Sequence, residues 1–265
     1  MDKIGIVNFK GGTGKTTTTL NLGACLKARN KKVILIDMDP QASLTIAAGY
    51  QDPDSIDQNI TKLMFNVMEN KKFDIRDYIL ENKEGLLMIP SGPDLTKVEL
   101  SLHQEIGREY ILRKALEQLE NYNFDFVILD SPPFISLLTI NIFSYIEKAL
   151  IPLSPDFLSF KAFSILKDSL ENIKNKTNKD LEILGILFNL ADLRTFHAKN
   201  LIEFTKKTFG DDIYIFKSIL RAHTGIKEAQ IAGQSILAYS PDSIGSSDYN
   251  NFVNEFLKVV KNGKE

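Results

Sequence analysis

The chain has 265 residues, of which 43% are hydrophobic and 25% are charged, and its formal net charge is −2. These are ordinary globular values, and they neither require nor exclude nucleic acid as a partner. The single cysteine, Cys25, excludes a disulfide within the chain and disfavours an iron–sulfur site, and we expect it to pack as a small apolar residue. Nothing resembles a signal peptide or approaches the ~20 apolar residues of a membrane span. We therefore expect one domain over residues 1–265, in the cytoplasm.

The first feature along the chain is a glycine-rich loop between a strand and a helix. The apolar run 4–8 predicts a buried strand, and apolar residues recur at helical spacing within 18–28. Between them lies Lys10-Gly11-Gly12-Thr13-Gly14-Lys15-Thr16-Thr17. Glycines let backbone N–H groups surround a phosphate at the positive end of the new helix. We expect Lys15 to reach the β- and γ-phosphates and the Thr16 hydroxyl to ligate Mg²⁺.

This loop departs from the usual P-loop pattern at its start. The pattern begins with a glycine five residues before Gly14, but here Phe9 occupies that position and Lys10 follows it. A second lysine at the mouth of a phosphate loop is repelled by Lys15 unless further negative charge lies nearby. Lys10 is then either a solvated surface lysine or a residue that reaches the phosphates of a neighbouring subunit.

Short apolar runs alternate with helical patterns through the rest of the chain. Strands are predicted at 33–36, 86–89, 127–129, 150–151, 183–188, 213–216 and 236–239, and helices at 108–121, 157–175, 196–209 and 246–261. Nearly continuous apolar strands separated by helices predict a doubly wound α/β fold, with a mostly parallel, twisted sheet covered by helices on both faces. In such folds, ligands bind at the carboxyl ends of the strands.

Aspartates follow two of these strands directly. The strand at 33–36 ends in Asp37 and Asp39, and the strand at 127–129 ends in Asp130. Aspartates often simply begin turns. Three carboxylates at the edge of the sheet that carries the glycine-rich loop instead indicate groups that hold Mg²⁺ or orient an attacking water.

The motifs together resemble those of the ParA/MinD family of deviant P-loop ATPases, whose signature is KGGxGK[ST]T. The segments VILIDMDPQASLT and VILDSPP resemble the two acidic motifs of that family. The segments 89–90, 99, 107–116, 189–195 and 228–249 also resemble ParA proteins of the small type, so the likeness covers nearly the whole chain. The resemblance implies a P-loop NTPase fold and ParA/Soj-type partition activity with ATP and Mg²⁺.

The resemblance also implies roles for individual residues. ATP is expected to contact Lys10, Gly11, Gly12, Thr13, Gly14, Lys15, Thr16 and Thr17, with Lys10 acting across a dimer interface. Mg²⁺ is expected near Thr16, Asp37 and Asp130, and Asp39 is expected to be needed for hydrolysis. The catalytic residues would then be Lys10, Lys15 and Asp39.

One stretch departs from the family pattern. Before Glu228-Ala229 the family has a proline, an asparagine and an arginine where this chain has Arg221, His223 and Gly225. The nucleotide-base and DNA contacts made there in the family are therefore not transferred. Arg221 and Lys227 could supply positive charge from displaced positions, and His223 is either a base-stacking residue or an ordinary surface or core histidine.

The sequence itself gives only a weak indication of DNA binding. Between Asp192 and Glu228, seven basic residues accompany five acidic ones: Arg194, Lys199, Lys206, Lys207, Lys217, Arg221 and Lys227 against Asp192, Glu203, Asp211, Asp212 and Glu228. No sequence-reading motif is present. Any contact should be to phosphates, independent of sequence and weakened by salt.

At the C-terminus, Phe252, Val253, Phe256, Leu257 and Val260 form an apolar stripe beside Lys258, Lys261 and Lys264. A MinD-like protein would use such a helix as a membrane anchor. We instead expect it to pack on the sheet, as most amphipathic helices of globular proteins do.

The resemblance therefore implies a slow ATPase switch that dimerises on ATP and binds double-stranded DNA without sequence preference. It would drive the segregation of plasmid or chromosomal DNA, with hydrolysis stimulated by a ParB-like centromere-binding partner, and it would be nucleoid-associated without stable membrane association. Two alternatives remain: a MinD-like or protein-cargo positioning ATPase, and a dethiobiotin synthetase-like metabolic ligase.

Overall fold

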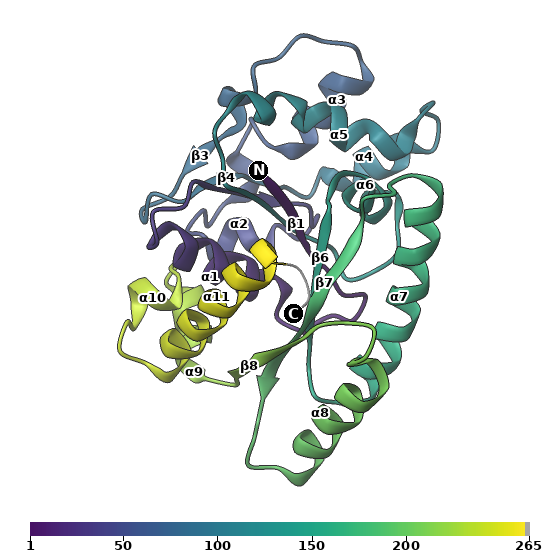
Figure 1. Cartoon of the computed structure of the whole chain (residues 1–265). Helices are drawn as coiled ribbons and strands as arrows, with labels where there is room; N and C mark the ends of the chain where they lie inside the picture. The colour runs from purple at the N-terminus through teal and green to yellow at the C-terminus, as the bar shows by residue number, and fades with distance from the viewer. Residues whose placement is uncertain (263–265) are drawn as a thin grey trace.

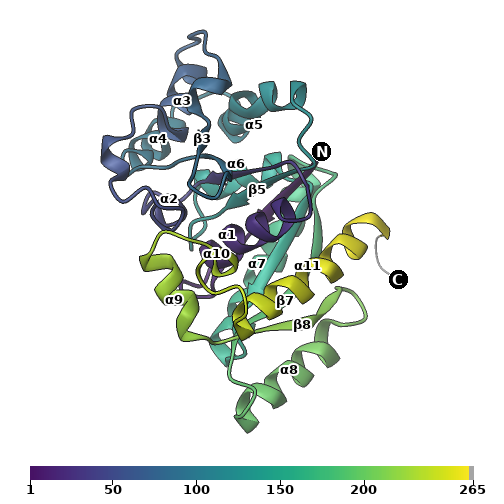
Figure 2. The same cartoon turned by 90° about the vertical axis from the view of Figure 1, so that its left-hand side faces the viewer.

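A computed structural model describes residues 1–262 and contains one eight-stranded sheet in the order β3-β4-β2-β5-β1-β6-β7-β8 (Figures 1 and 2). The strands are β1 (Asp2–Ile6), β2 (Val33–Asp37), β3 (Leu80–Glu81), β4 (Leu87–Ile89), β5 (Phe126–Asp130), β6 (Lys148–Leu153), β7 (Glu182–Ala191) and β8 (Ile215–Arg221). All neighbouring strands pair in parallel except β3 and β4, which are antiparallel. The predicted doubly wound, mostly parallel α/β fold is confirmed.

Helices cover both faces of this sheet. The α-helices are α1 (Lys15–Lys27), α2 (Ser43–Ala47), α3 (Ile60–Met68), α4 (Leu95–Leu102), α5 (Ile111–Leu116), α6 (Leu137–Tyr145), α7 (Phe157–Lys176), α8 (Phe196–Phe209), α9 (Thr224–Ile231), α10 (Ile236–Tyr239) and α11 (Ile244–Asn262). Four 3₁₀ turns accompany them: η1 (Pro53–Ser55), η2 (Ile75–Tyr78), η3 (Arg108–Tyr110) and η4 (Glu117–Asn121).

The sheet separates two hydrophobic cores because successive side chains of a strand point to opposite faces. In β2, Ile34 and Ile36 belong to the core beneath α3–α8, whereas Val33 and Leu35 belong to the core beneath α1, α2 and α9–α11. Cys25 on α1 is fully buried in the second core, which confirms its expected packing. The central strands are thus buried on both sides, as their continuous apolar sequences require.

The C-terminal helix α11 closes the second core. Phe252, Val253 and Phe256 have no exposed surface, and Leu257 and Val260 pack against the same core. The apolar stripe therefore faces the protein interior, as expected from the sequence, while the predicted neighbour Lys264 lies outside the described residues. Across residues 1–262, no helix is both long and apolar enough to traverse a bilayer.

Two of the predicted strands differ from the structure. Residues 236–239 form helix α10, because Ser235 caps it by accepting a hydrogen bond from Ala238 N–H and Asn21 accepts one from Ile236 N–H. A four-residue apolar run fits a strand and a buried helix equally well, so its period could not decide. The last strand, predicted at 213–216, starts at Ile215 and extends to Arg221.

Candidate functional site

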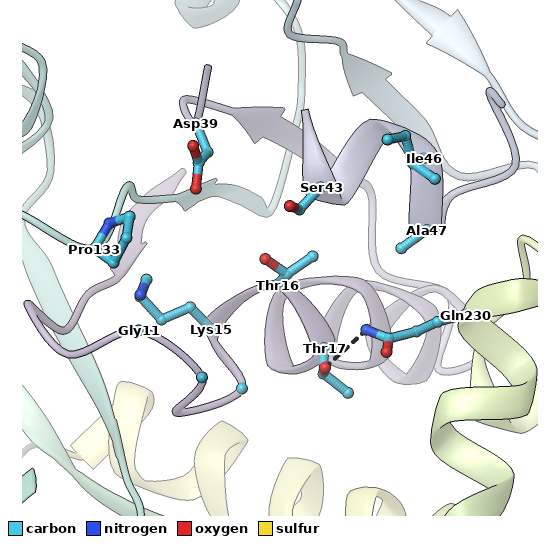
Figure 3. Close-up of a pocket in the computed structure, with 12 residues that line it drawn as sticks. Gly11, Lys15, Thr16, Thr17, Asp39, Ser43, Ile46, Ala47, Pro133 and Gln230 are labelled. Atoms are coloured by element: carbon cyan, nitrogen blue, oxygen red, sulfur yellow. Dashed lines mark hydrogen bonds between the residues drawn. The ribbon is translucent and has the colours of Figure 1, made fainter. Parts of the chain in front are cut away.

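The glycine-rich loop lies at the centre of the sheet's carboxyl edge, between β1 and α1. It borders a cavity of about 440 Å³ that is also lined by Asp39, Pro133, Gln230 and the helix α2 (Figure 3). The strands that end here, β2, β5 and β1, are adjacent in the sheet. The predicted loop and the predicted aspartates are therefore brought together at one place, as the topology of a doubly wound sheet requires.

The loop needs glycine at two positions. Gly12 and Gly14 have φ angles of 73° and 83°, in the left-handed region that favours glycine. A Cβ on Gly14 would also lie 2.2 Å from the side-chain nitrogen of Asn189. Asn189, at the end of β7, donates hydrogen bonds to the Thr13 carbonyl at 3.1 Å and to the Thr18 hydroxyl at 3.2 Å. This brace was not found from the sequence, because Asn189 is 176 residues from Thr13.

Lys15 points into the cavity from the first turn of α1 (Figure 3). Its side chain is only 7% exposed, and burial lowers its pKa, although Asp130 and Asp39 oppose that shift. Its ammonium lies 3.4 Å from the Lys10 carbonyl oxygen. A buried lysine at the N-terminus of a helix is a site with positive potential that a phosphate can neutralise.

Asp130 lies fully buried at the end of β5, directly below Thr16. The Thr16 hydroxyl donates to its carboxylate at 2.6 Å, and the Thr19 hydroxyl lies 3.4 Å from its other oxygen. Burial, together with the charge of Asp37, raises the pKa of Asp130 to about 8. This carboxylate is thus positioned to orient the Thr16 hydroxyl, and its charge is poorly compensated by the protein alone.

Asp37 is the register partner of Asp130 across β2 and β5. One of its oxygens accepts from Asp39 N–H at 3.1 Å, and the other accepts from Thr45 N–H and hydroxyl at 2.9 and 2.8 Å. Burial raises its pKa to about 6 despite these bonds. Asp37 therefore anchors the turn that carries Asp39 while adding a second buried carboxylate beside Asp130.

Asp39 faces the same cavity as Lys15 (Figure 3). It is 8% exposed, and burial raises its pKa, while the Gln41 N–H bond and the charge of Lys15 act in the opposite direction. Its backbone is fixed by the Ser91 hydroxyl, which donates to the Asp39 carbonyl at 2.8 Å. The sequence did not indicate Ser91, since nothing in the apolar run before it marks a contact to a turn 52 residues away.

These residues fit a divalent cation held jointly with phosphate. Within residues 1–262, no three Asp, Glu, His or Cys side chains converge to hold a metal by themselves. The donors present are the Thr16 hydroxyl and nearby carboxylates with little compensating charge, which suits Mg²⁺ bound through one or two protein oxygens, water and substrate phosphates. Ser43 of α2 also faces Thr16 across the cavity, a position that the sequence did not suggest (Figure 3).

Lys10 lies outside this cavity. Its ammonium lies 2.7 and 2.8 Å from the two carboxylate oxygens of Asp156 and 3.1 Å from the Ser159 hydroxyl. Asp156 caps the N-terminus of α7 by accepting from Ser159 N–H at 2.9 Å. The structure thus supplies negative charge for Lys10 within the same chain, from a helix that the sequence had not connected with the loop.

The segment that departs from the family pattern is held mainly by internal contacts. Arg221 donates to Asp248 through Nε at 2.9 Å and a terminal nitrogen at 2.6 Å, and Asp248 is buried. His223 accepts from Gly225 N–H at 3.1 Å and caps α9. Arg221 is thus ion-paired but still 45% exposed, and one ring nitrogen of His223 is engaged in the cap. The side chain of Gln230 donates to the Thr17 hydroxyl at 2.9 Å and links α9 to α1.

Comparison with known proteins gives consistent results. The family model described as an AAA domain matches residues 1–183. The chain is 34% identical to the sporulation initiation inhibitor protein Soj of Bacillus subtilis, over 98% of both chains. It is 30% identical to the chromosome partitioning protein ParA of Caulobacter vibrioides, over 96% of this chain and 93% of the other.

A solved structure has the same fold over the whole chain. Cobyrinic acid a,c-diamide synthase from Mycobacterium smegmatis, with bound ADP and magnesium, superimposes with a TM-score of 0.84 at 26% identity, over 100% of this chain and 97% of that one. The sequence matches extend through the glycine-rich loop, both acidic segments and the C-terminal helices. The chain therefore belongs to the ParA/MinD family of P-loop ATPases, and within it to the ParA/Soj type.

Proposed function

We propose that this protein is an Mg²⁺-dependent ATPase that dimerises on ATP, binds DNA without sequence preference as a dimer, and segregates plasmid or chromosomal DNA. The observation that carries the ATPase part is the cavity at the glycine-rich loop. Lys15 and Asp39 both line this cavity, together with Thr16, whose hydroxyl donates to Asp130. Relatives that include Soj and the chromosome partitioning protein ParA support the segregation part.

In this proposal each residue has a defined task. The loop N–H groups and Lys15 bind the phosphates and stabilise the charge transferred during hydrolysis. Thr16, oriented by Asp130 at 2.6 Å, ligates Mg²⁺, and Asp37 adds negative charge beside it. Mg²⁺ supplies electrostatic stabilisation of the phosphate oxygens. Asp39 positions the attacking water and accepts its proton, a task suited to a carboxylate that faces the cavity and has a raised pKa.

The edge of the sheet around the loop supports a dimer that closes over the nucleotide. Five large apolar side chains are exposed there, after the ends of β5, β6 and the segment following β7: Phe134 (44%), Ile135 (55%), Phe157 (62%), Leu158 (65%) and Phe196 (78%). We call this set the apolar rim. Exposed apolar groups at the edge of the sheet that carries a ligand site are compatible with a protein interface there. A second copy placed against the rim would bring the two Lys10 residues close to the opposite loops.

DNA contact in this proposal is made to phosphates, and a dimer doubles a small basic surface. Three of the basic residues counted in the sequence are already paired with acids: Arg194 with Asp192 at 2.8 Å, Lys206 with Glu203 at 2.9 Å and Arg221 with Asp248 at 2.6 Å. The remaining charge per subunit is modest, so binding should depend on dimerisation and weaken strongly with salt. A ParB-like, centromere-binding partner would stimulate hydrolysis and release the DNA.

Two single substitutions test the proposal. Lys10→Ala should bind ATP but fail to dimerise or to bind DNA, because the contact across the interface is lost. Asp39→Ala should bind ATP, dimerise and remain on DNA, with turnover reduced on the order of 100-fold, the size expected for loss of a catalytic base. Light scattering, DNA retention and phosphate release measure these outcomes. Undiminished turnover of Asp39→Ala, or ATP-dependent dimers of Lys10→Ala at normal strength, would refute the assignments.

The two alternative functions differ from the proposed one in what the ATPase would act on. The likeness to cobyrinic acid a,c-diamide synthase favours a metabolic ligase as the second candidate. A ligase would turn over rapidly only with a small acceptor, whereas a switch hydrolyses ATP slowly without one. A MinD-like or protein-positioning ATPase would sediment with liposomes or its protein cargo, rather than with DNA, when ATP is present.

A further inference from the structure

Asn189, near the end of β7, contacts the glycine-rich loop from the side that faces away from the cavity. Its side-chain nitrogen lies 3.1 Å from the Thr13 carbonyl oxygen, 3.4 Å from the Gly14 carbonyl oxygen and 3.2 Å from the Thr18 hydroxyl. Asn189 and Thr13 are both buried, and neither lines the cavity. Gly14 and Lys15 do line it. The amide therefore holds one side of the loop while the other side faces the ligand.

The orientation of this amide is fixed by the residue that follows it. The side-chain oxygen of Asn189 accepts from Leu190 N–H at 2.8 Å, so the side-chain nitrogen is the group that faces the loop. Leu190 has a φ of 55°, in the left-handed region that bulky side chains rarely adopt. Residues strained in this way persist only where the surrounding contacts hold them, and they cluster at functional sites. The turn thus keeps the donors of Asn189 directed at the loop.

The two carbonyls beside Asn189 belong to the peptide groups that carry the next N–H groups of the loop. A trans peptide group is planar, so its C=O and its N–H point in opposite directions. A Thr13 carbonyl held away from the cavity therefore directs the Gly14 N–H toward it, and the Gly14 carbonyl has the same relation to the Lys15 N–H. The Gly14 carbonyl also accepts from Thr18 N–H at 2.9 Å, in the first turn of α1. The contacts of Asn189 thus orient two backbone donors where α1 begins, which is where an anion is bound most favourably.

We propose that Asn189 is a positioning residue, which orients the Gly14 and Lys15 N–H groups for a phosphate of the nucleotide before the nucleotide binds. This inference rests on the proposed function, because it takes the ligand of the cavity to be ATP or ADP. Thr13 lies between Gly12 and Gly14, and glycine adopts positive and negative φ about equally readily. Without the amide, these peptide groups are free to rotate. Ordering them on binding costs conformational entropy, which lowers the affinity for nucleotide.

Asn189→Ala is the substitution that tests this positioning role. We expect the dissociation constants of ADP and of a non-hydrolysable ATP analogue to rise by the same factor, about tenfold, which is about 1.4 kcal/mol. The two factors should be equal because loop N–H groups surround the α- and β-phosphates, which both nucleotides carry. Titration calorimetry on the full chain with Mg²⁺ measures both constants.

Asn178→Ala is the matched control. Asn178 is also buried, at 5% exposed, and its amide also donates to two main-chain carbonyls, those of Phe143 and Ile146, at 2.8 and 2.6 Å. These contacts lie before the start of β6, at the opposite edge of the sheet from the loop. Asn178→Ala should lower the melting temperature as Asn189→Ala does, but it should leave both dissociation constants within about twofold of their normal values.

Two further measurements separate positioning from a loss of packing. Asn189→Leu keeps the approximate volume of the side chain but has no donor, so it should weaken binding of both nucleotides as much as Asn189→Ala does. In the nucleotide-free protein, the backbone amide NMR signals of Gly14 and Lys15 should shift or broaden in Asn189→Ala and stay in place in Asn178→Ala. If Asn189→Ala and Asn189→Leu do not fold, Asn189→Ser takes their place. Serine keeps one hydroxyl donor, and we expect binding to weaken by about threefold.

Three results would overturn the positioning role. The first is an affinity of the folded Asn189 variants within about twofold of that of the unmodified chain for both nucleotides. The second is a loss confined to the ATP analogue, because the loop donors would then not act on the phosphates that ADP shares. The third is an equal loss in Asn178→Ala, since any buried amide would then have the same effect. None of these results affects the proposed function, which fails instead if the unmodified chain neither binds nor hydrolyses ATP.

Discussion

The two lysines of the glycine-rich loop lie only five residues apart, but the protein treats their charges in opposite ways. Lys15 is 7% exposed, and burial lowers its pKa although the charges of Asp130 and Asp39 oppose the shift. Lys10 is partly exposed and is neutralised by Asp156 at 2.7 Å. The charge of Lys15 is thus only partly compensated by the protein, whereas the charge of Lys10 is compensated by Asp156.

The buried site and the Lys10 pair differ in what compensates their charges. Asp37, Asp130 and Lys15 are buried ionisable groups, and burial disfavours the charged form of each. Mg²⁺ and phosphate bound beside them would favour the charged forms. Lys10 and Asp156 instead form an ion pair within one subunit. The charge of Lys10 is therefore balanced by the protein itself, whereas the buried groups are suited to be balanced by a ligand.

Removing the buried lysine should have the largest effect. Lys15→Ala should weaken ATP binding on the order of 100-fold, or about 2.7 kcal/mol, because a charge-assisted contact to phosphate is lost in a buried place. Titration calorimetry with an ATP analogue measures the affinity. Lys31→Ala, which removes a lysine from the surface turn after α1, should leave it unchanged. Normal ATP affinity in Lys15→Ala would mean that the cavity is not the nucleotide site.

An intermediate effect is expected at the apolar rim. Phe196→Asp should weaken the ATP-dependent dimer about tenfold or more, because a charge would be buried in the interface, while ATP affinity of the monomer stays the same. Ile106→Asp is the control, since Ile106 is 96% exposed in the segment after α4 and is remote in sequence from the loop. If both variants dimerise like the unmodified chain, the apolar rim is not the dimer interface.

The smallest effect concerns stability and pH. The pKa of Asp130 is raised to about 8 from 3.8, so the folded state binds more protons than the unfolded state between about pH 4 and pH 8. The free energy of unfolding of the nucleotide-free protein should therefore fall as the pH rises through this range. Asp130→Asn should flatten that dependence and raise the melting temperature at pH 8 by about 2–4 °C, equivalent to about 1 kcal/mol.

The Asp130→Asn variant should be more stable than the unmodified chain but should bind magnesium and ATP less well. Magnesium and ATP should raise the melting temperature of the unmodified chain more than that of Asp130→Asn, because the Thr16 hydroxyl loses its charged acceptor. Calorimetry at pH 6 and pH 8, with and without nucleotide, provides the comparison. An equally steep fall in stability for Asp130→Asn would show that the buried carboxylate is not its source.

Much of the phosphate site was predictable because its residues are local in sequence. A glycine loop after a strand, and aspartates directly after two more strands, indicate one edge of one sheet without knowledge of packing. Helix α10 was predicted as a strand because its four apolar residues carry no clear period, and the contacts that decide its form come from Ser235 and Asn21. Asn189 and Ser91 were missed for a similar reason: their partners lie 176 and 52 residues away.

The sequence by itself determined the type of fold, the family and the groups available to bind phosphate and metal, since each depends on residue order within short segments. Only the tertiary structure decided where those groups find their charges. It placed Asp156, 146 residues beyond Lys10, close enough to neutralise it, and it paired Arg221 with Asp248. Electrostatic partners are set by distances in space, because the interaction energy of two charges decreases as they move apart. Those distances are not encoded in any local sequence pattern.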